Sequence, residues 1–173
     1  LGMDASDPMI TLATRATTAT PHQRMYDDRP GHQGHALVAS PWYETASADG
    51  SIVSTADDMC AYARLLLNRG VAPDGRLMSE ASFGLFTTRH VEDPSEDDWY
   101  GYGLGVYEKD GRTLIGHSGG MVGYSSYLMT DPEAGLAVRP DPSSAVSRQK
   151  TKKNRKDSVF SLPSGTEING PAR

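Results

Sequence analysis

The segment from Tyr100 to Val138 limits the possible folds most strongly, because its pattern predicts an antiparallel meander. Apolar residues alternate with glycines between positions 102 and 106, which is the period of a strand with one packed face. The pair Asp110-Gly111 can supply the positive φ of a tight hairpin turn. The expected strands span residues 102–106, 112–116, 124–130 and 136–138, the last two separated by a turn over 131–135.

The second of these strands is expected to end at His117-Ser118-Gly119-Gly120, which we call the His-Ser-Gly motif. Two glycines after a polar pair let another backbone or a ligand approach closely, so the motif is a candidate binding site. The alternative is a glycine bend beside a histidine whose polar atoms are satisfied within the fold. Spacing alone favours that alternative, because an isolated glycine in a strand usually marks a bulge or bend.

The residues around this motif resemble the third active-site motif of the serine β-lactamase and penicillin-binding-protein family. The matching residues are 116–126 and 131–136, and the resemblance is greatest to the class C β-lactamase, esterase and D-aminopeptidase branch, where His-x-Gly often replaces Lys-Thr-Gly. Leu1-Gly2-Met3, read as a helix end, and residues 50–59 match further upstream in the expected order. The resemblance covers residues 1–138 and implies an α/β (α+β) fold, with an antiparallel sheet flanked by helices.

Enzymes of this family cleave amide, lactam or ester bonds through an acyl-serine. Their Ser-x-x-Lys and Tyr-x-Asn motifs supply the nucleophile and the proton transfers. This sequence contains no Tyr-x-Asn or Ser-x-Asn, and its one Ser-x-x-Lys (Ser147–Lys150) lies in a basic segment after the His-Ser-Gly motif. We interpret that match as chance. The resemblance therefore implies the C-terminal portion of a serine hydrolase, inactive alone, or alternatively a non-catalytic ligand-binding or regulatory remnant.

The resemblance also assigns roles within the motif. It implies that His117 polarises the site and assists proton transfer, and that Ser118 hydrogen-bonds a substrate carboxylate or carbonyl. It implies that Gly119 lets the substrate lie against the strand, and that the Gly120 N–H is one of two oxyanion donors. It implies no cofactor and no metal, and its expected partner is the small-molecule or peptide substrate of the parent enzyme. Substrate, compartment and oligomeric state stay open.

Charge divides the chain into two expected parts. Residues 139–173 carry eight Lys or Arg against three Asp or Glu, a net charge of +5. Residues 1–138 carry a net charge of −10, which leaves −5 for the whole chain. Pro140 and Pro142 stand where a central strand would continue. The composition predicts a β-lactamase-like part over 1–138 and a basic, disordered tail over 139–173. The tail lacks interleaved aromatic residues, so we expect no nucleic-acid binding.

Capping patterns predict two helices in the first part. Ser54-Thr55 precedes two carboxylates and an apolar stripe that ends near residues 68–70, and Ser79 begins a second, shorter helix. Residues 1–50 are expected to form a long surface excursion, and the acidic residues 91–99 a solvated loop without calcium-site spacing. Cys60 falls on the apolar helix face, so we expect a core residue.

Several features are expected to be absent or exposed. His22, His32 and His35 lack a recognisable zinc spacing, and no apolar run is long enough to span a bilayer. We expect the meander to lose much of its covering layer, so that its apolar face favours self-association through the exposed sheet. The residues at risk of exposure are Leu104, Val106, Leu114, Ile115 and Leu128.

Overall fold

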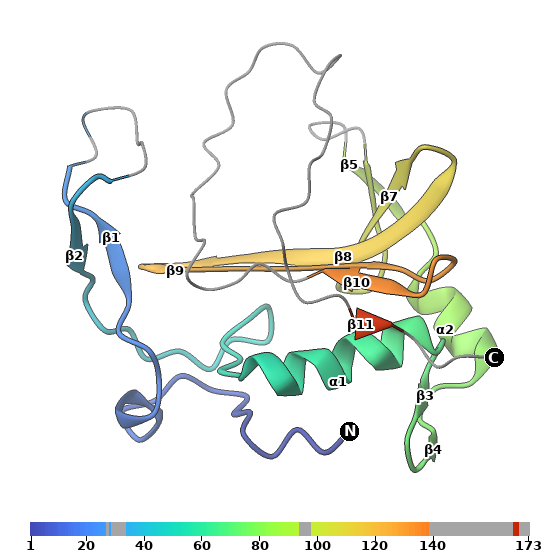
Figure 1. The fold of residues 1–173 in the computed structure, drawn as a ribbon, viewed down its shortest axis with the longest axis horizontal. Helices are drawn as coiled ribbons and strands as arrows, with labels where there is room; N and C mark the ends of the chain where they lie inside the picture. Colours follow the sequence, from blue (N-terminus) through green and yellow to red (C-terminus); the bar gives the residue numbers. More distant parts are fainter. Residues whose placement is uncertain (27, 29–33, 94–97, 139–167, 170–173) are drawn as a thin grey trace.

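The computed structural model describes the chain except residues 27, 29–33, 94–97, 139–167 and 170–173 (Figure 1). Its main feature is a seven-stranded sheet in the order β11-β10-β9-β8-β7-β6-β5, in which every neighbouring pair is antiparallel. The strands are β5 (Val91–Asp93), β6 (Asp98–Tyr100), β7 (Gly105–Lys109), β8 (Arg112–Met121), β9 (Tyr124–Asp131), β10 (Leu136–Val138) and β11 (Ile168–Asn169). The predicted antiparallel sheet is confirmed.

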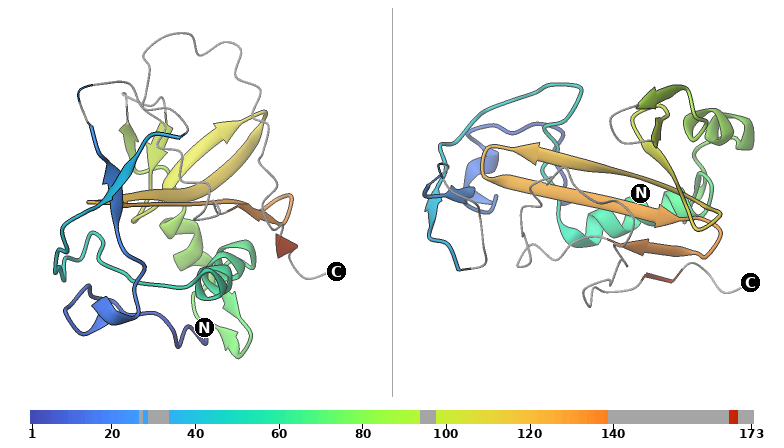
Figure 2. Two further views of the ribbon diagram at one scale, coloured as in Figure 1. Left: turned by 60° about the vertical axis from the view of Figure 1, so that its left-hand side comes forward. Right: turned by 90° about the horizontal axis from the view of Figure 1, so that it is seen from above.

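Two helices lie against one face of this sheet, α1 (Ala56–Leu67) and α2 (Glu80–Phe86) (Figures 1 and 2). Both predicted caps are present. The Thr55 side chain accepts a hydrogen bond from the Asp58 amide at 3.2 Å, and the Ser79 side chain accepts one from the Ser82 amide at 3.0 Å. Each cap satisfies an amide that the first helical turn leaves unpaired. The mixed α/β architecture that the resemblance implied is therefore confirmed.

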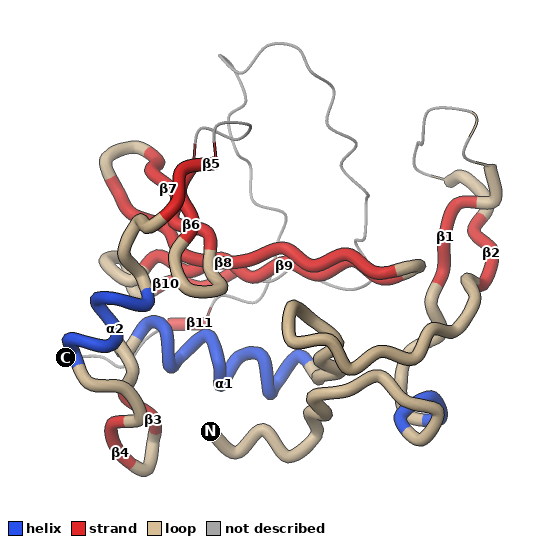
Figure 3. Tube along the Cα trace, turned by 180° about the vertical axis from the view of Figure 1, so that it is seen from behind, coloured by secondary structure: helices blue, strands red, loops and turns tan. Residues whose placement is uncertain are grey.

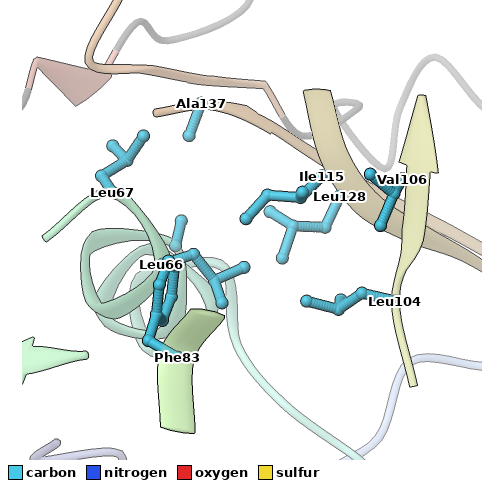
Figure 4. Packing of buried hydrophobic residues seen from close by; sticks show 9 residues of the cluster. Leu66, Leu67, Phe83, Leu104, Val106, Ile115, Leu128 and Ala137 are labelled. Carbon is cyan, nitrogen blue, oxygen red and sulfur yellow. The ribbon is translucent and has the colours of Figure 1, made fainter. Parts of the chain in front are cut away.

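The hydrophobic core lies between these helices and the sheet (Figure 4). Its buried members are Ala63, Leu66, Leu67, Phe83, Leu104, Val106, Ile115, Leu128 and Ala137. The expected exposure of the meander's apolar face is wrong for four of the five residues named for it, and Leu114 is half-buried. The reason is that α1 and α2 of the same chain cover that face, and each buried aliphatic side chain stabilises the fold by about 1.5–3 kcal/mol.

The segment before α1 is mostly irregular, as predicted, with three short elements. These are η1 (Thr14–Ala16) and the two-stranded sheet of β1 (His22–Arg24) and β2 (Leu37–Ala39). The β1–β2 hairpin stands beside the far end of the β8–β9 hairpin (Figures 1 and 3). The His22 amide donates to the Gly123 carbonyl at 3.0 Å, so these distant segments are hydrogen-bonded. No helix end is seen at Leu1–Met3, since three residues are fewer than one helical turn.

The acidic stretch 91–99 is not simply a loop, which corrects the prediction. Its described residues form β5 and β6, which pair from Val91↔Tyr100 to Asp93↔Asp98. Charged side chains suit this position because β5 is the last strand of the sheet, and charges on edge strands discourage pairing with other chains. All three residues of β5 are exposed, so no alternation of buried and exposed residues marks it as a strand. In β6, Trp99 packs on the core.

Two strand boundaries also differ from the prediction. The strand expected over 102–106 begins only at Gly105, because the chain turns through Gly103 at φ +74°. The strand expected to end at Gly116 continues to Met121. Between α1 and α2 the chain forms a small antiparallel pair of β3 (Val71–Ala72) and β4 (Gly75–Arg76).

Most of the basic segment 139–173 lies outside the described residues, so its predicted disorder stays a prediction. The exception is β11, which pairs with β10 as Leu136↔Asn169 and Ala137↔Ile168. Within the described part of the chain, neither α1 nor α2 has the length and apolarity needed to cross a bilayer.

Candidate functional site at the open edge of β8

The His-Ser-Gly motif lies inside β8, not after its end as predicted. On one side it pairs with β9, as His117↔Leu128, Ser118↔Tyr127, Gly119↔Ser126 and Gly120↔Ser125. On the other side β7 pairs with β8 only as far as Gly105↔Gly116. The motif therefore occupies the stretch where β8 leaves its β7 partner. No strand among the described residues pairs with that side of the motif, which we call the open edge of β8.

The register shows which backbone groups face that edge. The two-residue turns at 110–111 and 122–123 make Lys109↔Arg112 and Met121↔Tyr124 hydrogen-bonded pairs. Because pairs of this kind alternate along a ladder without a bulge, the odd-numbered residues of the motif bond toward β9. The N–H and C=O groups of Ser118 and Gly120 therefore point to the open edge. Among the described residues, none forms a hydrogen bond with either amide.

The glycines of β8 differ in the space around them. A Cβ at Gly120 would meet no heavy atom within 4 Å, and Gly120 is exposed. A Cβ at Gly119 would collide with the Ser126 hydroxyl, and one at Gly116 with the Leu128 carbonyl oxygen. Gly116 thus allows close approach of β9, whereas at Gly120 no described atom occupies the position that a side chain would take.

His117 has a partner that sequence reasoning missed. The Tyr100 hydroxyl lies 2.6 Å from His117 Nε2, and the two rings meet edge to face at 73° with centroids 5.6 Å apart. Tyr100 stands opposite Gly105, which stands opposite Gly116, so it reaches the motif from two strands away. The three residues of β6 carry no clear strand pattern, so the sequence held no signal for this contact, which depends on the pairing of β6 with β7.

Residues 6–139 match the protein family described as Beta-lactamase. The chain belongs to the beta-lactamase family. It is 36% identical to penicillin-binding protein 4 of Amycolatopsis lactamdurans in a match 101 residues long that covers 54% of this chain and 26% of that protein. Its fold is similar to an octameric penicillin-binding protein homologue from Pyrococcus abyssi, with a TM-score of 0.64 and 25% identity over 80% of this chain and 30% of that one. The chain thus spans less than a third of either relative.

Aromatic residues continue around the motif of this beta-lactamase-family chain. Tyr102 packs against His90 with ring centroids 4.4 Å apart, and the His90 amide donates to the Tyr100 carbonyl at 3.0 Å. Burial raises the pKa of the Tyr107 hydroxyl, and nearby Tyr127 and Asp98 raise it further. The two contacts of His90 join the start of β5 to the segment that carries Tyr100, the partner of His117.

The described residues include no group of three His, Cys, Asp or Glu side chains that could hold a metal ion. His22 Nδ1 instead lies 2.8 Å from the Thr20 carbonyl oxygen, and His32 is outside the described residues. Cys60 is half-buried on α1. Two small hollows of about 150 and 190 Å³ are lined by residues other than those of the His-Ser-Gly motif.

Proposed function

We propose that this chain is part of a serine hydrolase that forms an acyl-serine on amide, lactam or ester bonds. In this proposal the His-Ser-Gly motif is the substrate-facing strand segment. The single observation that carries it is the open edge of β8, toward which the Gly120 amide points with no partner among the described residues. Family membership supports the same class of reaction.

Each motif residue has a role in this proposal. The Gly120 N–H donates to the oxyanion that develops on the substrate carbonyl, and a second amide, next to the nucleophile, donates from the other side. The Ser118 hydroxyl binds a carbonyl or carboxylate of the substrate. His117 polarises the site and carries a proton during acyl transfer. Gly119 keeps the strand surface free of a side chain where the substrate lies.

The nucleophile and its base are not assigned to this chain, because the sequence offers no Tyr-x-Asn and only the Ser147–Lys150 match. An oxyanion donor without a nucleophile does not turn over substrate. We therefore expect the 173-residue chain to hydrolyse a chromogenic β-lactam or a short-chain nitrophenyl ester no faster than its His117→Ala variant. We also expect no covalent label from penicillin or a fluorophosphonate. A labelled serine anywhere in the chain, Ser147 first, would contradict this.

The second candidate is a ligand-binding or regulatory remnant that keeps the motif without chemistry. The test is to extend the coding sequence upstream of Leu1, express the longer protein and treat it with a fluorophosphonate and a labelled penicillin. Labelling of a serine in an upstream Ser-x-x-Lys, reduced at least tenfold in rate by His117→Ala, would support the hydrolase. An extension with neither motif, or no labelling, would favour the remnant.

A further inference from the structure

The contact between Tyr100 and His117 is short. At 2.6 Å, the separation between the hydroxyl oxygen and Nε2 is below the usual 2.7–3.2 Å of an N–H donor bonded to oxygen. It lies within the range of about 2.5–3.0 Å found for O–H donors bonded to oxygen, which favours the hydroxyl as the donor. A phenol that donates to Nε2 requires that nitrogen to be unprotonated. The ring proton of neutral His117 is then on Nδ1.

We infer that Tyr100 is a positioning residue for His117, which holds the imidazole as its Nδ1–H tautomer with Nε2 accepting. The use of this tautomer rests on the proposed function, in which His117 contacts the substrate. There, the tautomer places the ring proton on Nδ1. Among the described residues, none accepts a hydrogen bond from Nδ1. The hydrogen bond at one ring nitrogen sets whether the other nitrogen carries the proton. The Nδ1–H is therefore the ring donor that remains available to a substrate atom.

The fold holds Tyr100 firmly enough for this role. The preceding residue, Trp99, packs on the hydrophobic core, and β6 pairs with β7 at Trp99↔Val106 and Tyr100↔Gly105. The Tyr100 carbonyl accepts from the His90 amide at 3.0 Å. The edge-to-face packing of the two rings further restricts the orientation of the imidazole.

Nitrogen NMR of the full 173-residue chain tests this directly without substrate. Long-range proton–nitrogen spectra are recorded at roughly pH 8, above the ordinary histidine pKa of about 6.5, and His117→Gln identifies the His117 signals. We expect Nδ1 at a protonated, pyrrole-type shift and Nε2 at a pyridine-type shift. In Tyr100→Phe, we expect the Nδ1–H form to fall from the dominant to the minor tautomer.

The matched control is Tyr102→Phe, which removes a neighbouring phenol that contacts His90 and not His117. It should leave both His117 nitrogen shifts unchanged. A wild-type spectrum with the proton on Nε2 would overturn the inference, and so would an unchanged tautomer in Tyr100→Phe. Neither result depends on acyl-serine labelling, so this inference and the proposed function can fail separately.

Discussion

At the scale of single residues, two glycines of β8 differ in whether a side chain would fit at their position. A Cβ at Gly116 would strike the Leu128 carbonyl and lie 2.9 Å from Met129 Cα, both backbone atoms that cannot rotate away. Gly120 lies four residues further along the same strand, and a Cβ there would meet nothing within 4 Å. The two positions therefore form a matched pair for substitution.

We predict that Gly116→Ala lowers the free energy of unfolding by about 1–3 kcal/mol, because overpacking forces β8 and β9 apart. Gly120→Ala should change it by less than about 0.5 kcal/mol, as expected at an open position. Urea unfolding of both variants measures the difference. Equal losses in the two variants would show that β9 does not pack this closely on Gly116.

At the scale of elements, the tip of the β8–β9 hairpin is hydrogen-bonded to the segment around β1. Gly123 adopts φ +79°, and a Cβ there would approach Ser40 Oγ at 2.5 Å and Pro21 Cβ at 2.7 Å. The Tyr124 hydroxyl donates to the Ala19 carbonyl at 2.7 Å, and the His22 amide donates to the Gly123 carbonyl. This attachment fixes the end of the strand that carries the motif.

Tyr124→Phe removes one of these hydrogen bonds, which is worth about 0.5–1.5 kcal/mol. We predict that the His22 amide then exchanges roughly fivefold faster with solvent, since about 1 kcal/mol of local opening free energy is lost. Hydrogen exchange followed by NMR measures it. Tyr43→Phe is the control, because that side chain is 55% exposed. Equal acceleration in both variants would contradict the attachment.

The sequence predicted those elements whose signals are local. Helices α1 and α2 begin where Thr55 and Ser79 cap them, and the Asp110-Gly111 turn places both residues at positive φ. Strands β5 and β6 were missed because their identity comes from pairing, not from composition. The length of β8 was underestimated for the same reason. Glycines have little strand propensity, and the glycines of the motif are held in an extended conformation by pairing with β9.

The location of the candidate site could be predicted from the sequence only in part, and the roles of its residues stay predictions. The motif residues were singled out by resemblance, but their sequence could not reveal that β7 begins only at Gly105 and pairs with β8 no further than Gly116. Tyr100 was missed because its contact with His117 spans seventeen residues of chain and depends on the registers of β6 and β7. The covering of Leu104 and Ile115 by α1 and α2 is likewise a property of tertiary packing.

At the scale of the whole molecule, partly buried tyrosines link stability to alkaline pH. Burial raises the pKa of Tyr62, which packs against the core from α1, and burial also raises that of Tyr107. A raised folded-state pKa means that the folded protein retains its proton where the unfolded chain has lost it. This stabilisation is complete below pH of about 10 and is lost as pH rises through the folded-state value.

We predict that the melting temperature falls between pH 9.5 and 11 as measured by circular dichroism, and that Tyr62→Phe reduces the fall. The exposed Tyr102, changed to Phe, should keep the wild-type slope because its side chain is 62% exposed. A pH dependence identical in Tyr62→Phe and wild type would mean that Tyr62 is hydrated in the folded state.

The central claim is that the open edge of β8 receives the substrate carbonyl, with the Gly120 amide as oxyanion donor. The most direct measurement is a crystal structure of the upstream-extended protein acylated by a β-lactam. The account predicts the acyl carbonyl oxygen about 2.7–3.1 Å from the Gly120 nitrogen, beside the Ser118 hydroxyl. An acyl oxygen bound elsewhere, or a β8 edge paired with another strand of the same protein, would contradict it.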